Sequence, residues 1–439
     1  LNTFMTVSAS LTSQPQSRLT KRDSGLVVAS TNMPHANSLA IGIWLSVGSR
    51  DERPDEHGIA HMLEHMAFKG TESRDAETIA RQVEDIGGFI NAHTSREETA
   101  YYIRLLPEHL EFALDMLVDI LTQSTLPDTE IAREKGVIIQ EIGQANDTPD
   151  DIVFDQFQSL CYPQHPIGRP ILGTTDSVND FGRSDLSGFM NRYYGAGNMI
   201  LSAAGRVDHD DLMTHIDAIE KKLIRAVDVP ERRVPQWPDQ QDKRQDILIR
   251  ELEQTHLVFG WPVAPTNDHD RWALRALSIL YGGGMSSRLF QEVREKRGLC
   301  YSVFSFGQMM SDCGVFGVYA GTDAKDGNEL ITVAMDQLAH LAQKTTGDEL
   351  ERAKAQMRSA VLMGRESVMN ICEMMPREWI RYGELKDANS QLDAINAIDR
   401  HHIEQLSQKI LAEYPVLAAI GDSRANALMS PEKMDKLIR

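Results

Sequence analysis

The chain has 439 residues, of which 41% are hydrophobic and 25% charged, a balance typical of folded globular proteins rather than disordered chains. Its length predicts about two to four domains, and its longest apolar run, residues 39–47, is too short to span a membrane. The 45 basic and 64 acidic residues give a net charge of −19, which disfavours nucleic-acid binding because phosphate backbones are repelled.

The cysteines and the N-terminal segment bear on the cellular compartment. Four cysteines (Cys161, Cys300, Cys313, Cys372) without CxxC spacing are too few for a disulfide scaffold and favour a reducing compartment. Residues 1–22 lack a secretory pattern; without acidic residues and rich in Ser and Thr, they weakly resemble a transit peptide. We favour a frayed leader before the first strand, and a bacterial cytoplasmic protein, with the mitochondrial matrix as the alternative.

Strands and helices come in groups along the first half. Residues 25–30 and 38–47 are rich in Val, Ile and Leu and predict strands, and 89–95 with 99–106 predict a hairpin. Helices are expected over residues 57–69, 75–86, 107–123, 128–145 and 149–160. Such grouping predicts an α+β fold in which a mostly antiparallel sheet packs with helices.

The two halves of the chain resemble each other. A proline-rich and charged stretch, residues 227–245, predicts a linker between domains 1–226 and 246–439. Three pairs of similar segments, 39–44 with 257–261, 130–134 with 349–353 and 200–205 with 416–421, recur in the same order at offsets of 216 to 219. One long offset predicts a duplicated domain rather than a solenoid.

The segment His61-Met-Leu-Glu64-His65 carries the sharpest chemical signal. On a helix, residues three and four apart share a face, so both imidazoles and the carboxylate can meet at one point. Two histidines with a third ligand from elsewhere make a zinc site, and Glu64 can take a proton from a water activated there. The order HxxEH inverts the commoner HExxH metalloprotease motif.

The third ligand is expected on the helix predicted over 128–145. Glu134 and Glu141 lie seven residues apart, hence on one face two turns apart. Either carboxylate could reach the metal, while the other could brace a ligating histidine. Further along, Asp151 and Asp155 share a face of the next predicted helix; the helix dipole explains an acidic residue at 151 better than one at 155.

These motifs together resemble the pitrilysin/insulinase metallopeptidases, in particular the short branch with the mitochondrial processing peptidase β subunit and its bacterial relatives. The resembling stretches are GIAHMLEHMAFKGT (58–71), GGFINAHTSREETAYY (87–102), EKGVIIQEI (134–142), HPIGRPILGT (165–174) and SSRLFQEVREKRGLCYS (286–302). The resemblance implies two homologous α+β domains and a zinc endopeptidase acting on extended peptides or presequence-like segments in an enclosed cleft.

The resemblance also assigns roles to residues. His61, His65 and Glu141 would hold one Zn²⁺ per chain, Glu64 would be the general base, and Glu134 would brace a ligand histidine. Ala353 and Ala360 stand at the offset of 219 from Glu134 and Glu141, so the second half would be a supporting wall without metal.

Substrate contacts are implied as well. Arg294 and Tyr301 of the second half would donate hydrogen bonds to substrate, and Asn91 and Ala92 would lie on an edge strand that pairs with peptide backbone. Asp151 and Asp155 would receive a basic substrate residue. His93 departs from the apolar residue common in relatives, and we leave it out of the metal set.

We therefore expect a zinc metalloendopeptidase that forms a homodimer with a shared active site. A non-catalytic assembly subunit of the same fold is the alternative from another class, which the intact His61, Glu64, His65 and Glu141 set disfavours. A catalytic subunit that needs a different partner is the third possibility, disfavoured because one chain carries both the metal set and Arg294 with Tyr301.

Overall fold

The computed structural model describes residues 16–223, 229–239, 242–266 and 270–437 and contains two sheets, each packed with helices. The strands of the first half are β1 (Ser17–Lys21), β2 (Val27–Asn32), β3 (Leu39–Leu45), β4 (Phe89–Thr94), β5 (Thr99–Leu105) and β6 (Met199–Gly205). Its helices are α1 (Ile59–Met66), α2 (Ala76–Asp85), α3 (Leu110–Thr122), α4 (Asp128–Asn146), α5 (Pro149–Cys161), α6 (Thr175–Asp180), α7 (Arg183–Tyr193) and α8 (His209–Leu223).

The first sheet has the strand order β1-β2-β6-β3-β5-β4, with β2 and β6 parallel and the other neighbours antiparallel. The apolar runs of β2 and β3 are buried because helices cover both faces of the sheet. The expectation of a frayed leader is wrong for residues 17–21, which pair with β2 as strand β1; residues 1–15 lie outside the described part. The predicted helix at 57–69 is shorter, since α1 begins at Ile59 and ends at Met66.

The second half repeats this architecture. Its strands are β7 (Gln245–Ile249), β8 (Thr255–Pro262), β9 (Cys300–Met309), β10 (Gly314–Thr322) and β11 (Val416–Gly421). Its helices are α9 (Arg271–Gly282), the π-helix η6 (Phe290–Glu295), α10 (Gly327–Gln343), α11 (Gly347–Gly364), α12 (Val368–Tyr382), α13 (Ala388–Ala397), α14 (Arg400–Ala412) and α15 (Pro431–Lys436).

Strand order confirms the duplication. The second sheet runs β7-β11-β8-β10-β9, which matches β2-β6-β3-β5-β4 position by position, including the single parallel pair. Helix α11 begins 219 residues after α4 begins, as the sequence offset predicts. Both sheets end in an edge strand, β4 in one and β9 in the other.

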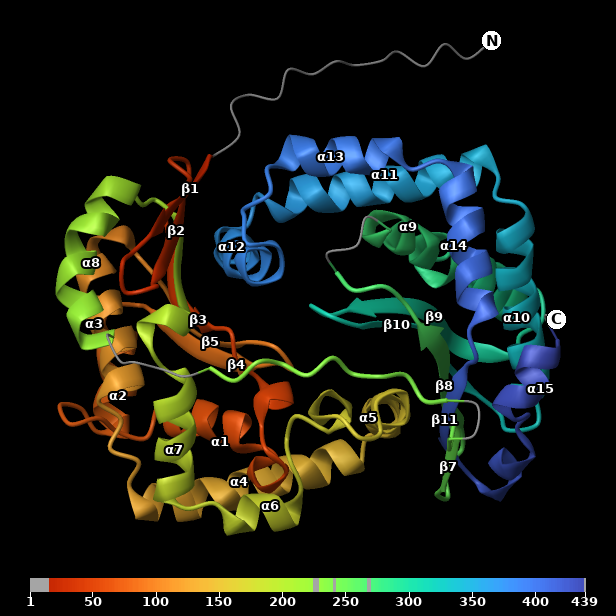
Figure 1. Ribbon diagram of the computed structural model, residues 1–439, viewed down its shortest axis with the longest axis horizontal. Coiled ribbons are helices and arrows are strands. Elements are labelled where there is room, and N and C mark those ends of the chain that lie inside the picture. Colours follow the sequence, from red (N-terminus) through yellow and green to blue (C-terminus); the bar gives the residue numbers. More distant parts are fainter. Residues whose placement is uncertain (1–15, 224–228, 240–241, 267–269, 438–439) are drawn as a thin grey trace, which may run out of the picture.

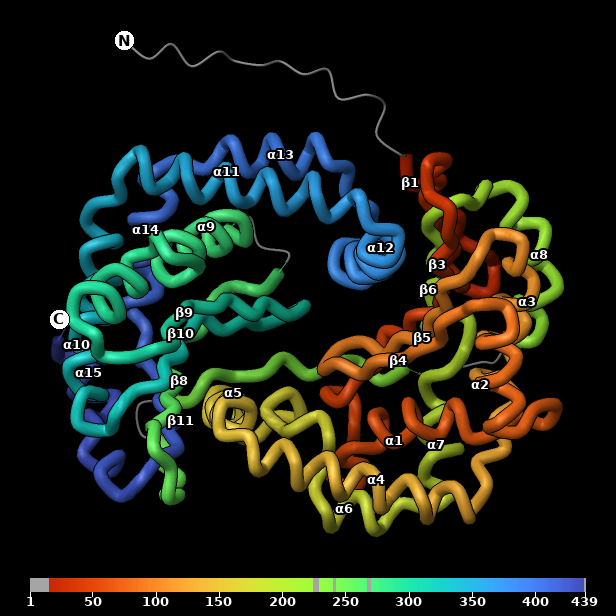
Figure 2. The backbone as a smooth tube through the Cα atoms, turned by 180° about the vertical axis from the view of Figure 1, so that it is seen from behind, coloured from red at the N-terminus to blue at the C-terminus, as the bar shows by residue number. Residues whose placement is uncertain are grey.

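The two halves exchange one helix each. Helix α5 of the first half packs on strands β11 and β8 of the second sheet, and α12 of the second half packs on β6, β3 and β2 of the first. Figures 1 and 2 show both helices between the two sheets, whereas α3 and α8 lie on the outer side of the first sheet and α10 and α14 on the outer side of the second. Each sheet is therefore buried on its inner face by the opposite half.

A buried ion-pair cluster joins the halves beside these helices. The side chain of Arg50 is 0% exposed and contacts Glu97 at 2.6 Å and, across the seam, Asp312 at 2.7 Å. The described part of the linker, residues 229–239, is extended and crosses between the halves (Figure 1). Its Arg232 pairs with Asp51 at 2.8 Å, so the linker is anchored to the first half.

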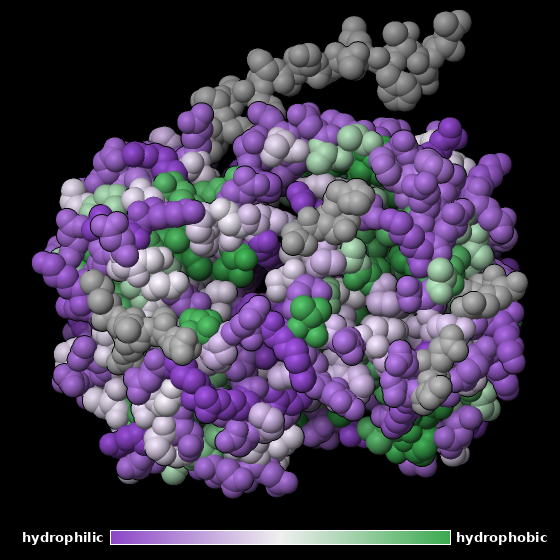
Figure 3. Space-filling model, in the orientation of Figure 1, coloured by the Kyte–Doolittle hydropathy of each residue, from purple (hydrophilic) through white to green (hydrophobic). Residues whose placement is uncertain are grey.

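The surface agrees with the acidic, charged composition. Figure 3 shows a mainly hydrophilic face with scattered hydrophobic groups and a recess near its middle, between the halves. Among the described residues no helix is long and apolar enough to cross a membrane.

Candidate metal centre and substrate site

Helix α1 carries the HxxEH segment and is fixed at its N-terminus by a carboxylate. The side chain of Glu52, fully buried, accepts hydrogen bonds from the backbone N–H groups of Gly58 (2.9 Å) and Ala60 (3.0 Å), which are helix donors without intrahelical partners. Gly58 adopts a positive φ of 94° and a Cβ there would lie 2.8 Å from the Cα of Gly173, so only glycine fits.

The same helix divides its residues between core and site. Met62, Leu63 and Met66 are buried in the core of the first half, whereas His61, Glu64 and His65 are only partly buried. This arrangement follows from helical spacing and turns the three chemically active side chains away from the core.

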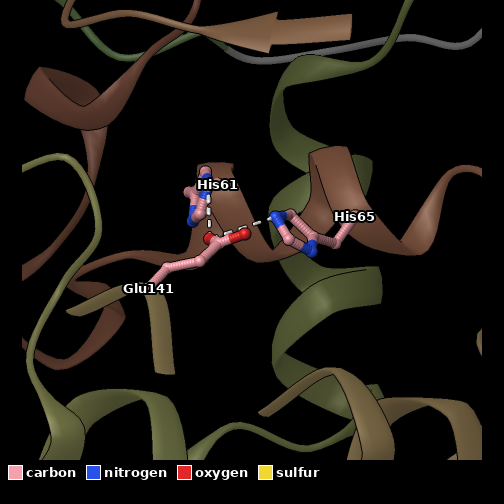
Figure 4. Close-up of side chains that lie close together, drawn as sticks. All are labelled: His61, His65 and Glu141. Carbon is pink, nitrogen blue, oxygen red and sulfur yellow. Dashed lines mark ion pairs between the residues drawn. The ribbon is translucent and has the colours of Figure 1, made fainter. Parts of the chain in front are cut away.

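Two imidazoles and one carboxylate converge, as Figure 4 shows. The Oε2 atom of Glu141 on α4 lies 3.7 Å from His61 Nε2 and 3.5 Å from His65 Nε2, and one ligand atom from each residue lies within 4.8 Å of the others. The imidazole rings are 4.7 Å apart and inclined by 68°. Two nitrogens and one oxygen at these separations fit the ligand set of a catalytic zinc site that leaves a position open.

Glu134 and Glu141 contact different atoms, a distinction that residue spacing alone left open: Glu141 lies between both imidazoles, whereas Glu134 contacts only His65. Glu134 Oε2 lies 3.0 Å from His65 Nδ1, and its Oε1 lies 2.7 Å from Lys69 Nζ. A carboxylate only accepts, so Nδ1 donates and the lone pair of Nε2 faces the cluster. Burial raises the pKa of Glu134, but the hydrogen bonds from Lys69 and His65 outweigh it, so the pKa falls below its usual value.

His61 is held neutral by its surroundings. Burial, assisted by the nearby charge of His65, lowers the pKa of His61 to about 4. A neutral imidazole is the form that binds a metal. Its Nδ1 is buried and makes no hydrogen bond within the described part of the chain, so, unlike His65, His61 has no protein acceptor to orient its ring.

Glu64 lies beside this cluster and next to a tyrosine pair. The hydroxyls of Tyr101 and Tyr194 are 2.9 Å apart. Burial raises the pKa of Tyr194, the hydrogen bond to Tyr101 lowers it, and the charge of Glu64 raises it again. Glu64 makes no ion pair within the described residues.

The predicted substrate strand is an open edge. Asn91 and Ala92 lie on β4, which pairs with β5 and with no other strand among the described residues. Asn91 is exposed, and its Oδ1 accepts a hydrogen bond from the N–H of Ala92 at 2.9 Å. His93 contacts Arg377 at 3.3 Å and does not belong to the metal cluster.

The two aspartates of α5 have different surroundings. Asp151 is exposed in the first turn of the helix. Asp155 is paired with Arg96 at 3.4 Å, and burial, with the charge of Asp151, raises its pKa although Arg96 lowers it. Asp155 also lines a cavity of about 570 Å³, so its carboxylate is shared between Arg96 and open space.

Arg294 and Tyr301 form a pair in the second half. The guanidinium of Arg294 lies 4.7 Å from the centre of the Tyr301 ring, and Tyr301 is 72% exposed at the start of β9. Figure 1 places β9 and α1 in opposite halves of the molecule. The structure therefore brings this pair together but sets it apart from the metal cluster of the same chain.

Sequence reasoning missed two supporting residues. Lys69 lies beyond the C-terminal end of α1, which ends at Met66, and contacts Glu134 from there; its position four residues after His65 was the only hint in the sequence. No sequence pattern predicts the role of Glu52. Its hydrogen bonds to Gly58 and Ala60 depend on the conformation of the loop that precedes α1.

Comparison with known proteins identifies the family. Residues 27–175 match the family described as insulinase (peptidase family M16), and residues 180–357 match the peptidase M16 inactive domain. The chain belongs to peptidase family M16.

Similar proteins carry the corresponding names. An uncharacterized zinc protease of Rickettsia felis is 37% identical, covering 92% of this chain and 97% of the relative, and one of Bacillus subtilis is 34% identical, covering 91% and 97%. A protease from Helicobacter pylori has a TM-score of 0.86 at 23% identity, covering 92% of this chain and 99% of that one, and shows the fold alone. The resemblance drawn from the sequence motifs is confirmed at the level of the family.

Proposed function

We propose that the protein is a zinc-dependent endopeptidase that hydrolyses extended peptides. The convergence of His61, His65 and Glu141, with Glu64 on the same face of α1, supports this proposal. The names of the relatives, zinc proteases of family M16, point the same way. One zinc ion per chain follows from the single cluster of metal-binding side chains found among the described residues.

Each residue then has a chemical task. Zinc, when bound, supplies Lewis-acid chemistry that acidifies water and polarises a carbonyl. Glu64 accepts the proton of the attacking water and returns it to the departing amine. Glu134 keeps His65 in the tautomer that presents Nε2, and the open edge of β4 hydrogen-bonds the peptide backbone with little demand on its sequence.

A basic residue near the cleaved bond suits the acidic cavity beside α5. This cavity of about 570 Å³ is lined by Asp155, Asp176 and Asp246 and by no basic side chain of the described chain. A guanidinium or ammonium group entering it would find carboxylates within reach. Asp151, on the same helix, adds negative charge nearby.

The site is completed across a homodimer. Arg294 is partly exposed and Tyr301 is exposed, and both lie in the half of the chain that does not contain α1. A second copy of the chain can therefore bring its own Arg294 and Tyr301 to the metal. Two-fold symmetry then gives two equivalent sites. An inactive Glu64→Gln chain mixed with an inactive Tyr301→Phe chain should regain activity, because one site of each mixed dimer carries neither change; verified subunit exchange without recovery would contradict sharing.

A reducing compartment such as the bacterial cytoplasm fits the four free thiols and the bacterial relatives.

The decisive experiment separates an enzyme from an assembly subunit. Glu64→Gln keeps the size of the side chain but cannot accept a proton, so zinc should stay bound while peptide cleavage falls by about 10²- to 10⁴-fold. Glu77→Gln, an exposed change on α2, is the matched control. A wild-type protein that binds zinc stoichiometrically but cleaves no member of a random peptide library would instead be a non-catalytic subunit.

A further inference from the structure

A second cavity lies in the half without metal ligands. It measures about 400 Å³ and is bordered by α9, α11, α12 and α13. Two acidic side chains line it against six basic ones: Arg271, Arg275, Arg365, Arg377, Arg381 and Lys386. The chain carries a net charge of −19, so the local charge of this cavity is opposite in sign to that of the whole molecule.

Ion pairs and hydrogen bonds within the chain engage the acidic side chains of this cavity. Arg377 contacts Glu98 at 2.6 Å and Glu373 at 3.1 Å. Glu378 accepts hydrogen bonds from the backbone N–H of Lys386 and from the side chain of Gln391, both at 2.8 Å. Both carboxylates that line the cavity, those of Glu373 and Glu378, therefore already have partners within the chain.

Four guanidinium groups lie beyond ion-pair distance of every described carboxylate, although burial lowers the pKa of Arg365 and the charges of Glu378 and Asp387 partly offset that lowering. Within the described part of the chain, Arg271, Arg275, Arg365 and Arg381 form no ion pair. Arg365 donates one hydrogen bond to the Lys386 carbonyl, while its buried Nε atom has no partner there. Arg271 instead lies over the ring of Tyr382 at 4.8 Å. Arg275 and Arg381 are exposed, whereas the unpartnered Nε of Arg365 is buried, where an unpaired charge is costly; an anionic ligand would remove that cost.

The basic cavity is the counterpart of the acidic cavity of the first half. At the offset of 219, Ile142, Ala145 and Asn146 of the acidic cavity correspond to Val361, Gly364 and Arg365 of the basic one. The bordering helices correspond as well, α4 and α5 to α11 and α12. The duplicated fold has therefore kept one cavity in each half and given the two opposite charge.

The basic cavity also adjoins the strand assigned to substrate. Arg377 contacts His93 of β4 at 3.3 Å and pairs with Glu98 in the hairpin loop that follows β4. A peptide along the open edge of β4 therefore passes close to α12, which carries Arg377 and Arg381.

We propose that the basic cavity binds acidic side chains of the peptide substrate. The inference rests on the proposed peptidase function and adds a substrate class: peptides with clustered Asp or Glu residues. Guanidinium groups match carboxylates with paired, charge-assisted hydrogen bonds, and a concave basic surface attracts acidic peptides despite the acidic surroundings.

The test measures binding without cleavage. Zinc-loaded Glu64→Gln protein is titrated into two labelled peptides that differ only in three Glu or three Gln residues, and affinity is read by fluorescence anisotropy. We expect at least about tenfold tighter binding of the Glu peptide at low salt, a preference that falls as salt rises. Adding R275E and R381E, both exposed changes, should abolish the preference, and R275Q with R381Q should reduce it.

A matched control has the same net charge as the R275E and R381E variant. R352E with R400E changes exposed arginines outside the cavity by the same amount, and this variant should keep the preference. Equal affinity for the two peptides, no binding of either, or a preference that survives R275E with R381E would overturn the inference. Binding of inorganic phosphate to the cavity without discrimination between the peptides would also overturn it. Failure of wild-type protein to cleave peptides, with the binding preference intact, would count against the peptidase function alone.

Discussion

Helix α4 of the first half and helix α11 of the second occupy the same place in their repeats but carry different chemistry. Their buried apolar positions correspond, Ile131 with Leu350 and Ile138 with Met357. The polar positions do not: alanines stand in α11 where Glu134 and Glu141 stand in α4. Packing of apolar residues is enough to keep the fold, so the candidate metal cluster is an addition to the scaffold that the second half lacks among its described residues.

The largest effect should come from exchanging one residue between these helices. Glu141→Ala removes the carboxylate between His61 and His65, so zinc binding and cleavage should both be lost. The reciprocal Ala360→Glu should add no second zinc, because α9 supplies no histidine. Metal analysis of purified protein checks both, and a ratio of two zinc ions per chain in Ala360→Glu would contradict the asymmetry.

Truncating one buried side chain in each exchanged helix should have the next largest effect, a loss of folding stability. Phe157 of α5 is buried against the second sheet, and Met375 of α12 against the first. Phe157→Ala should cost about 3–5 kcal/mol and Met375→Ala about 2–5 kcal/mol of stability. Hydrogen exchange should show each variant loosening the sheet of the opposite half. Loosening confined to the half that carries the change would contradict the exchange.

Removing the brace on His65 should weaken the metal site without destroying it. Glu134→Gln replaces an acceptor of His65 and a partner of Lys69, and we expect zinc affinity to fall about 10- to 100-fold. Competition with a chromogenic chelator measures it. Glu130→Gln, on the same helix and paired with Arg133, is the control and should retain wild-type affinity.

Acid should destabilise the metal-free protein through His61. The pKa of His61 in the folded chain is about 4, below the ordinary value of 6.5. Between pH 6.5 and about pH 4 the unfolded chain therefore binds a proton that the folded chain does not. The free energy of unfolding should therefore fall by about 2 kcal/mol from about pH 6.5 to about pH 5. Metal-free His61→Gln should lack this contribution in urea titrations; identical losses in both proteins would argue against it.

The smallest effect is expected for the exposed acidic residue of α5. Asp151→Asn should reduce cleavage of arginine-containing peptides more than that of neutral ones, by no more than about fivefold, because exposed ionic contacts contribute up to about 1 kcal/mol. Values of kcat/KM for the two peptides give the comparison. An equal reduction for both would remove Asp151 from substrate recognition.

Local pattern predicted most of the elements and the residues of the candidate metal cluster, for identifiable reasons. Helical spacing brings His61, Glu64 and His65 to one face whatever the rest of the chain does. The choice between Glu134 and Glu141 needed the placement of α4 against α1. Strand β1 was missed because its mixed, half-exposed residues form a strand only through pairing with β2.

The helix exchange was beyond sequence reasoning for a different reason. The apolar faces of α5 and α12 show that each is buried, but periodicity cannot say which sheet receives it. The charge contrast of the two cavities likewise depends on side chains from separate segments, such as Asp246 and Asp155.

The exchanged helices have a consequence for the origin of the chain. A single ancestral half would have left the inner face of its sheet bare, and a second copy could cover it by lending the helix that became α5 and α12. Such an ancestor is a helix-swapped dimer with two identical sites. Joining its genes through residues 224–244 would preserve the swap while freeing each copy to mutate separately, so that one copy could retain a metal site and the other could lose it.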